Sequence, residues 1–157
     1  MTMRSWLPLI VSPLLAGCIN ETASLRFDGP EHALILQARQ AWFWQPVVDL
    51  EVVMSRPPDC QRRSRLDAAA TAEVGMEVLR PDEGEFVEPI LILRQGARYY
   101  AVSTRNCEMQ PFAKAPEKTG TLLGTFRLEA KKLKFVAAPE PRAPAVATPA
   151  TLPAGRQ

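Results

Sequence analysis

The chain carries few side chains that could act as a nucleophile or a general base. It has three cysteines, Cys18, Cys60 and Cys107, and a single histidine, His32, in 157 residues. Nucleophilic catalysis needs a serine or cysteine beside a base, and the sequence has neither a Gly-x-Ser-x-Gly motif nor a Cys–His context. Paired carboxylates for glycoside hydrolysis form in space, and no spacing along the chain points to such a pair. We therefore expect a protein that is not an enzyme.

The same residues give little support for a metal or cofactor site. Cys60 and Cys107 lie 47 positions apart, unlike the closely spaced thiols of a zinc site, and only one imidazole could join them. The acidic turn formed by Asp82, Glu83 and Glu85 lacks the carboxylate spacing of a calcium loop. The sequence therefore predicts no bound metal and no cofactor.

Aromatic side chains are the best candidates for a binding surface. Trp42, Phe43 and Trp44 are consecutive, and Tyr99 and Tyr100 are adjacent. If residues 42–44 lie in a strand, at least one ring must point away from the core and could offer an apolar platform to a sugar, a peptide or a protein. Alternatively, a loop or a neighbouring strand covers that ring. The tyrosines could line a cleft, although adjacent tyrosines are also common in strands.

Four arginines surround the second cysteine, at positions 56, 62, 63 and 65. They could form a cationic patch for lipid headgroups or an anionic polysaccharide. The alternative, which we favour, is a solvated segment whose charges are paired with Asp59, Asp67 and the acidic faces of neighbouring strands.

The N-terminal segment has the features of a secretion signal. Arg4 precedes an apolar run of eleven residues, 6–16, which contains Pro8 and Pro13. As a helix this run would be about 17 Å long, too short for a bilayer core of about 30 Å. A short apolar run behind a positive charge is typical of a signal peptide.

The tetrapeptide Leu15-Ala16-Gly17-Cys18 resembles the bacterial lipobox. The resemblance covers residues 1–18 only. It implies that Cys18 receives a diacylglyceryl thioether, that the chain is cut before it, and that the new amine is acylated. Ile19 rather than aspartate follows the cysteine, which implies sorting to the outer membrane, facing the periplasm. The alternative is a buried N-terminal element with an incidental cysteine.

Removal of residues 1–17 would change the charge and the cysteine inventory. Loss of Arg4 leaves 18 basic against 17 acidic residues, so the mature chain is nearly neutral and we expect no nucleic-acid partner. Cys60 and Cys107 would then be the two remaining thiols in an oxidising compartment, where a disulfide is the default. The alternative is a redox pair.

Alternating apolar residues dominate the rest of the chain and predict β-strands. Val48, Leu50, Val52 and Met54 share one face of residues 47–55. Residues 90–93 are apolar on both faces, which indicates a central strand. Further strands are expected at residues 24–27, within 32–44, and at 72–79, 86–93, 98–104, 121–129 and 132–136, with hairpins at 86–104 and 121–136. The alanine-rich stretch near residues 64–71 predicts a short helix.

These segments predict a mainly β, antiparallel domain, either a small sandwich or a partly open barrel. The domain organisation expected is a lipoprotein signal peptide at 1–17, a tether at 18–23, a single β domain at 24–138 and a disordered Pro/Ala-rich tail at 139–157.

Two functions fit this organisation. The first is a lipid-anchored, non-catalytic interaction module that docks to an envelope assembly through an exposed aromatic surface or a sheet edge. The second is a small-ligand-binding or hydrolase-inhibiting β-barrel lipoprotein. An enclosed apolar pocket near Tyr99 or Trp44 would favour the second, and a flat exposed patch would favour the first.

Overall fold

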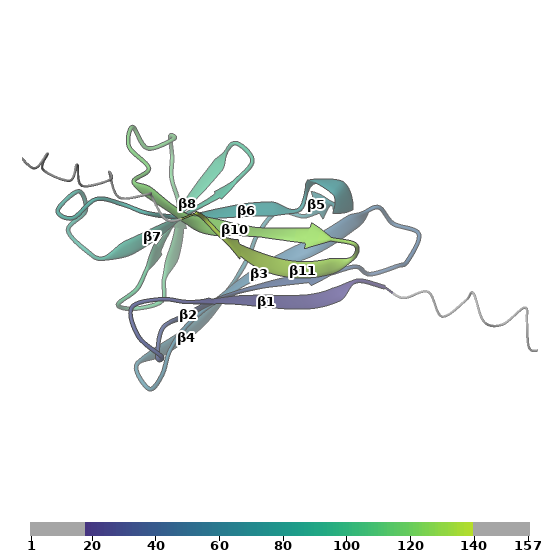
Figure 1. Ribbon diagram of the computed structural model, residues 1–157, viewed down its shortest axis with the longest axis horizontal. Coiled ribbons are helices and arrows are strands. Elements are labelled where there is room, and N and C mark those ends of the chain that lie inside the picture. Colours follow the sequence, from purple (N-terminus) through teal and green to yellow (C-terminus); the bar gives the residue numbers. More distant parts are fainter. Residues whose placement is uncertain (1–17, 140–157) are drawn as a thin grey trace, which may run out of the picture.

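The computed structural model describes residues 18–139 as two antiparallel sheets packed face to face (Figure 1). The expected signal peptide at residues 1–17 and the expected tail, apart from Pro139, lie outside the described residues. The predicted β class is confirmed, and the two sheets do not close into a barrel.

The first sheet has the strand order β1-β2-β3-β4, with the short β5 paired to the start of β3. Its strands are β1 (Asn20–Arg26), β2 (Ala33–Arg39), β3 (Val47–Arg56), β4 (Cys60–Arg65) and β5 (Ala69–Ala70). Each of these four strands pairs antiparallel with the next, so β1, β2, β3 and β4 run up and down in chain order.

The second sheet has the order β11-β10-β6-β7-β8-β9. Its strands are β6 (Gly75–Arg80), β7 (Ile90–Gln95), β8 (Arg98–Ser103), β9 (Met109–Pro111), β10 (Thr121–Glu129) and β11 (Lys132–Ala137). The β7–β8 and β10–β11 hairpins confirm the two predicted from the sequence. Leu91, Ile92 and Leu93 are all buried, as expected for a central strand.

The core lies between the inner faces of the two sheets. Val48, Leu50, Val52 and Met54 on β3 are all buried, which confirms the two-residue period predicted for that strand. They belong to the same core cluster as side chains of the second sheet, including the fully buried Phe126 of β10. Burial of this apolar surface is the main force that holds the sheets together.

Two edge strands, one from each sheet, lie side by side along one side of the sandwich, whereas a groove separates β4 from β9 along the other. β1 contacts β11, and Lys132 Nζ lies 2.8 Å from Glu21 Oε1. On the opposite side, Arg62 of β4 forms an ion pair of 3.3 Å with Glu108, next to β9. We call these two sides of the sandwich, along which the edges of the two sheets face each other, the seams. Each seam is crossed by an ion pair.

A disulfide joins Cys60 to Cys107 across the second seam, with the Cα atoms 5.9 Å apart. Cys60 begins β4 in the first sheet, and Cys107 follows β8 in the second. The predicted bridge is confirmed, and it connects the two sheets covalently.

The expected tether at residues 18–23 is wrong. β1 already begins at Asn20, and Ile19 is only 4% exposed. The segment has a polar composition because β1 is an edge strand whose outward residues face water, and edge strands tolerate polar side chains well. The ordered sandwich therefore begins one residue after Cys18.

The expected helix near residues 64–71 is also wrong. This region contains the end of β4, the short β5 and a single 3₁₀ turn at Thr71–Glu73. Backbone pairing of Arg65 with Glu51 on β3 places the chain in the sheet, so tertiary pairing overrides the helix propensity of alanine.

Candidate functional site

Trp42, Phe43 and Trp44 lie in the connection between β2 and β3 rather than in a strand, so the predicted strand position is wrong. We call these three residues the aromatic loop. Their exposed fractions are 56%, 57% and 63%. The strand interpretation required only one ring to point outward; all three are exposed, because the chain leaves the sheet after Arg39.

The rings of the aromatic loop pack on one another. Trp42 and Trp44 are stacked, with centroids 5.1 Å apart and planes inclined by 17°, while the edge of Phe43 meets Trp44 at 4.7 Å. The Gln45 amide donates to the Trp42 carbonyl over 3.0 Å and closes the turn. The loop thus presents one continuous apolar cluster, and aromatic clusters of this kind are typical of contact surfaces.

A largely buried glutamine, Gln40, ties this loop to the start of the domain. Its backbone amide donates to the Ile19 carbonyl over 2.8 Å, and the Ile19 amide donates to Gln40 Oε1 over 3.2 Å. Gln40 Nε2 donates to the carbonyl of Gln45, on the far side of the aromatic loop. The side chain therefore bridges the residue after Cys18 and both ends of the loop.

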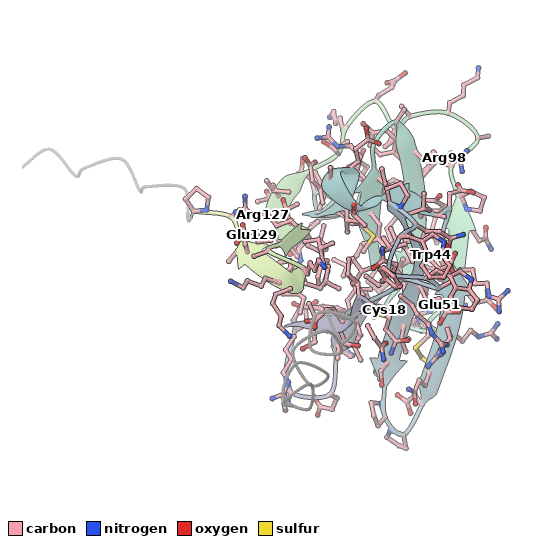
Figure 2. All side chains as sticks on the ribbon, turned by 90° about the vertical axis from the view of Figure 1, so that its right-hand side faces the viewer. Cys18, Trp44, Glu51, Arg98, Arg127 and Glu129 are labelled. Atoms are coloured by element: carbon pink, nitrogen blue, oxygen red, sulfur yellow. A yellow bond between two sulfur atoms is a disulfide. The ribbon has the colours of Figure 1, made fainter. Side chains whose placement is uncertain are left out.

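Cys18 is exposed and is the free cysteine of the described residues. A depression of about 510 Å³ beside it is lined by Arg39, Asp49 and Trp42, and a second one of about 410 Å³ links Ile19 to Phe43 and Trp44. Cys18 and Trp44 accordingly appear on the same end face of the sandwich (Figure 2). The same end carries the β2–β3 connection and the β10–β11 turn (Figure 1).

The two tyrosines do not join this surface. Tyr100 is 8% exposed and packs in the core, so its predicted place on a binding surface is wrong. Tyr99 is half-buried on β8, opposite Arg94 of β7. The pKa of the Arg94 guanidinium is raised above its ordinary value, first by a hydrogen bond from Arg94 to Glu77 and then by one to Tyr99. Tyr99 is thus part of a polar cluster across β6, β7 and β8.

The arginines around Cys60 are paired with acidic side chains, as the favoured interpretation predicted. Arg56 lies 3.3 Å from Asp59, Arg62 pairs with Glu108, and Arg63 and Arg65 share the carboxylate of Glu51 at 3.1 and 3.4 Å. Asp67 pairs instead with Arg98 of β8. This pairing reduces the field that a cationic patch would need.

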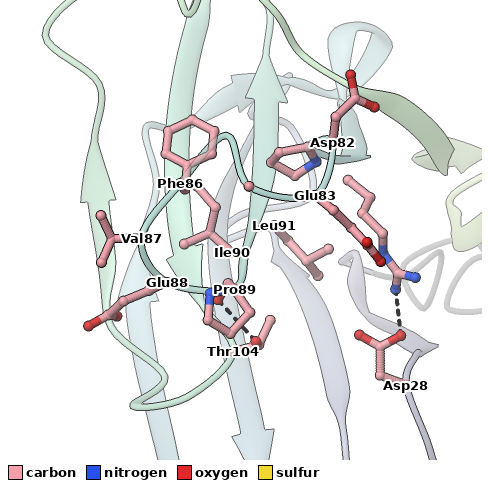
Figure 3. A pocket seen from close by; sticks show the side chains of 13 residues that line it. Asp28, Asp82, Glu83, Phe86, Val87, Glu88, Pro89, Ile90, Leu91 and Thr104 are labelled. Atoms are coloured by element: carbon pink, nitrogen blue, oxygen red, sulfur yellow. Dashed lines mark hydrogen bonds and ion pairs between the residues drawn. The ribbon is translucent and has the colours of Figure 1, made fainter.

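A hollow of about 450 Å³ lies at the end of the sandwich opposite Cys18, in the size range of small-molecule sites (Figure 3). Its lining combines charged and apolar side chains. Arg80 Nη2 and Asp28 Oδ1 are 2.8 Å apart on one side, and Asp82, Glu83 and Glu88 line the rest together with Phe86 and Ile90. The loop that forms its rim carries a fully exposed Val87. The hollow lies away from Tyr99 and Trp44, where a ligand-binding protein was expected to have its pocket.

Comparisons with protein-family models, with curated proteins and with solved structures find no match. Within residues 18–139, no helix is long and apolar enough to cross a membrane. In the same part of the chain, no group of three or more histidine, cysteine or acidic residues is arranged to hold a metal ion.

Proposed function

We propose that this protein is a lipid-anchored, non-catalytic interaction module of the bacterial envelope, held to the outer membrane through Cys18 and facing the periplasm. The observation that carries the proposal is that an exposed Cys18 stands directly before the first strand, at one end of the sandwich. The lipobox-like tetrapeptide and the apolar run before it support the same assignment.

An anchor at Cys18 would leave the opposite end of the sandwich free to meet a partner. That end carries the loop between β6 and β7, in which Val87 is fully exposed among Glu85, Glu88 and other acidic residues. An apolar tip inside an acidic loop suits a protein partner with a basic, partly apolar surface. The hollow beside it is open to solvent and combines five charged side chains with Phe86, Ile90 and Leu91, so it is not the enclosed apolar pocket that the ligand-binding alternative needs, and this supports the interaction module.

The anchor is tested by replacing Cys18 with serine. The wild-type chain produced in a bacterium is expected in the membrane fraction and cut before Cys18. Its mass should exceed that of residues 18–157 by the diacylglyceryl group and the acyl chain on the amine, three acyl chains in all. Several chains are needed because one alone anchors a protein only marginally. The Cys18→Ser chain is expected to be uncut or soluble. As a control, Cys60→Ser/Cys107→Ser should stay with the membranes. Wild-type protein that is soluble and retains Met1 would refute the anchor.

The module is tested by site-specific crosslinking in cells. A photoreactive residue at position 87 is expected to capture one envelope protein, whereas the same residue at position 61, on the arginine-rich β4, should capture none. Position 61 is a fair control because Gln61 is also exposed. Equal capture at both positions, or none at position 87, would argue against the distal loop as the docking surface.

A further inference from the structure

We propose that the aromatic loop inserts into the interfacial layer of the bilayer that holds Cys18, so that the domain sits directly on the membrane in one orientation. The inference rests on the anchor of the proposed function and adds a second membrane contact. The exposed aromatic rings would then contact lipid headgroups and the first carbons of the acyl chains.

Cys18 is connected to the folded domain without a flexible linker. Ile19 is buried, and both of its backbone polar groups are hydrogen-bonded to Gln40. One residue spans about 3.8 Å, so a lipid on Cys18 holds the Ile19 end of the sandwich at the bilayer surface. Trp42 borders the same depression as Cys18 and must therefore lie at that surface as well.

The side chains of the aromatic loop have the chemistry of a membrane interface. Tryptophan is enriched at membrane–water interfaces because its ring is apolar and its N–H can bond to water or headgroups. An apolar face that rests on a membrane is buried by about 5–10 Å in the headgroup and acyl boundary. Three packed rings, each more than half exposed, are suited to that depth. Gln40 holds the loop in place, so little further ordering is needed on insertion.

The charges around the aromatic loop are mixed. The two depressions beside the aromatic loop contain Arg39 and Lys131 but also Asp49. The rim therefore carries charges of both signs, and insertion should depend on the aromatic rings and hardly on anionic lipid. A protein partner at this end would have to fit between the domain and the bilayer, and the structure leaves no tether to make room for it.

Fluorescence can test the inference because the probes are already present. The chain has three tryptophans, and Trp6 lies before Cys18, so a chain of residues 18–157 contains only Trp42 and Trp44. With Cys60 and Cys107 joined, Cys18 is the free thiol and can be coupled to a maleimide lipid in phosphatidylcholine vesicles. We expect the tryptophan emission to shift to the blue and to be quenched by lipids brominated near the start of their acyl chains, with and without added phosphatidylglycerol.

The matched control reverses the orientation. In Cys18→Ser/Val87→Cys the same lipid is attached at the opposite end, and the tryptophans should keep the emission of the free chain. For the uncoupled Cys18→Ser chain, Phe43→Ser should lower the vesicle partition coefficient about fivefold or more, because a large apolar side chain is lost. Val87→Ser removes a fully exposed apolar side chain at the far end and should leave the coefficient unchanged.

The inference is overturned if the Cys18-coupled tryptophans remain as accessible to aqueous iodide as in the free chain, and the aromatic loop would then be free for a protein. Quenching from both attachment points would overturn it too, since orientation would not matter. The coupling is chemical, so these results do not depend on whether cells lipidate Cys18. Failure of the inference and failure of the cellular anchor are therefore seen in separate experiments.

Discussion

Replacement of Phe126 by alanine is expected to lower the free energy of unfolding by about 3–5 kcal/mol. Phe126 lies on β10, between β6 and β11, and is fully buried. Its ring meets that of Phe135 on β11 at 4.8 Å. Removal of the ring leaves a cavity that neighbouring strands can fill only in part, because backbone pairing holds them apart. Urea denaturation followed by far-ultraviolet circular dichroism measures the loss.

The matched control is Phe43→Ala in the aromatic loop. The same side chain is lost there from an exposed position, so the change should stay within about 0.5 kcal/mol. The loss expected for Phe126→Ala is a large part of the total stability of such a domain, which is about 5–15 kcal/mol. The two variants should therefore be compared at a low temperature at which Phe126→Ala is still folded. Similar losses for the two variants would contradict the position of the core between the sheets.

Loss of the disulfide is expected to be nearly as costly. For the 47-residue separation, the chain-entropy model gives about 4 kcal/mol. The bridge matters here because it ties β4, at the edge of one sheet, to the segment after β8 in the other. We expect Cys60→Ser/Cys107→Ser to fold but to unfold at a lower urea concentration than the wild type.

Peptide mapping without reductant provides the direct readout. It should yield one peptide pair that links Cys60 to Cys107 in the wild type and also in Cys18→Ser, which leaves the bridge intact. Two free thiols in protein recovered from an oxidising compartment, or an unchanged stability of the double variant, would argue against a structural role for the bridge.

The strands that bury a complete face were predictable from the sequence. On β3 every second residue from Val48 to Met54 is apolar, and in β7 the apolar run of Leu91, Ile92 and Leu93 leaves no polar face. These patterns arise because a buried face needs apolar side chains, and the types of the side chains are known directly from the sequence. The two hairpins were also predictable, because the turns between their strands are short.

The edge strands were not predictable in the same way. β4 consists of Cys60-Gln61-Arg62-Arg63-Ser64-Arg65, and most of its side chains face water. It is a strand because its backbone pairs with β3, and backbone pairing leaves no mark on composition. For the same reason β1 resembled a tether.

The candidate site was predictable only in its parts. An outward position was expected for at least one of the rings of residues 42–44, but their proximity to Cys18 was not. That proximity depends on the register of β1 with β2, which places Asn20 opposite Arg39. When residues 18–23 are interpreted as a tether, they have no strand partner. The sequence then gives no reason to place Cys18 near residues 42–44. Tyr100 was misplaced because inward and outward positions on β8 differ by a single residue.

The two charged seams of the sandwich bear on aggregation. An unpaired strand edge can template the addition of a strand from another molecule, and such addition leads to fibres. Here the edge of β1 is occupied by β11, with the Lys132–Glu21 ion pair beside it. The edge of β4 carries Arg62 and Arg63, and a second copy could pair there only by disturbing their ion pairs with Glu108 and Glu51. The domain can therefore be crowded on a surface at high density without joining edge to edge.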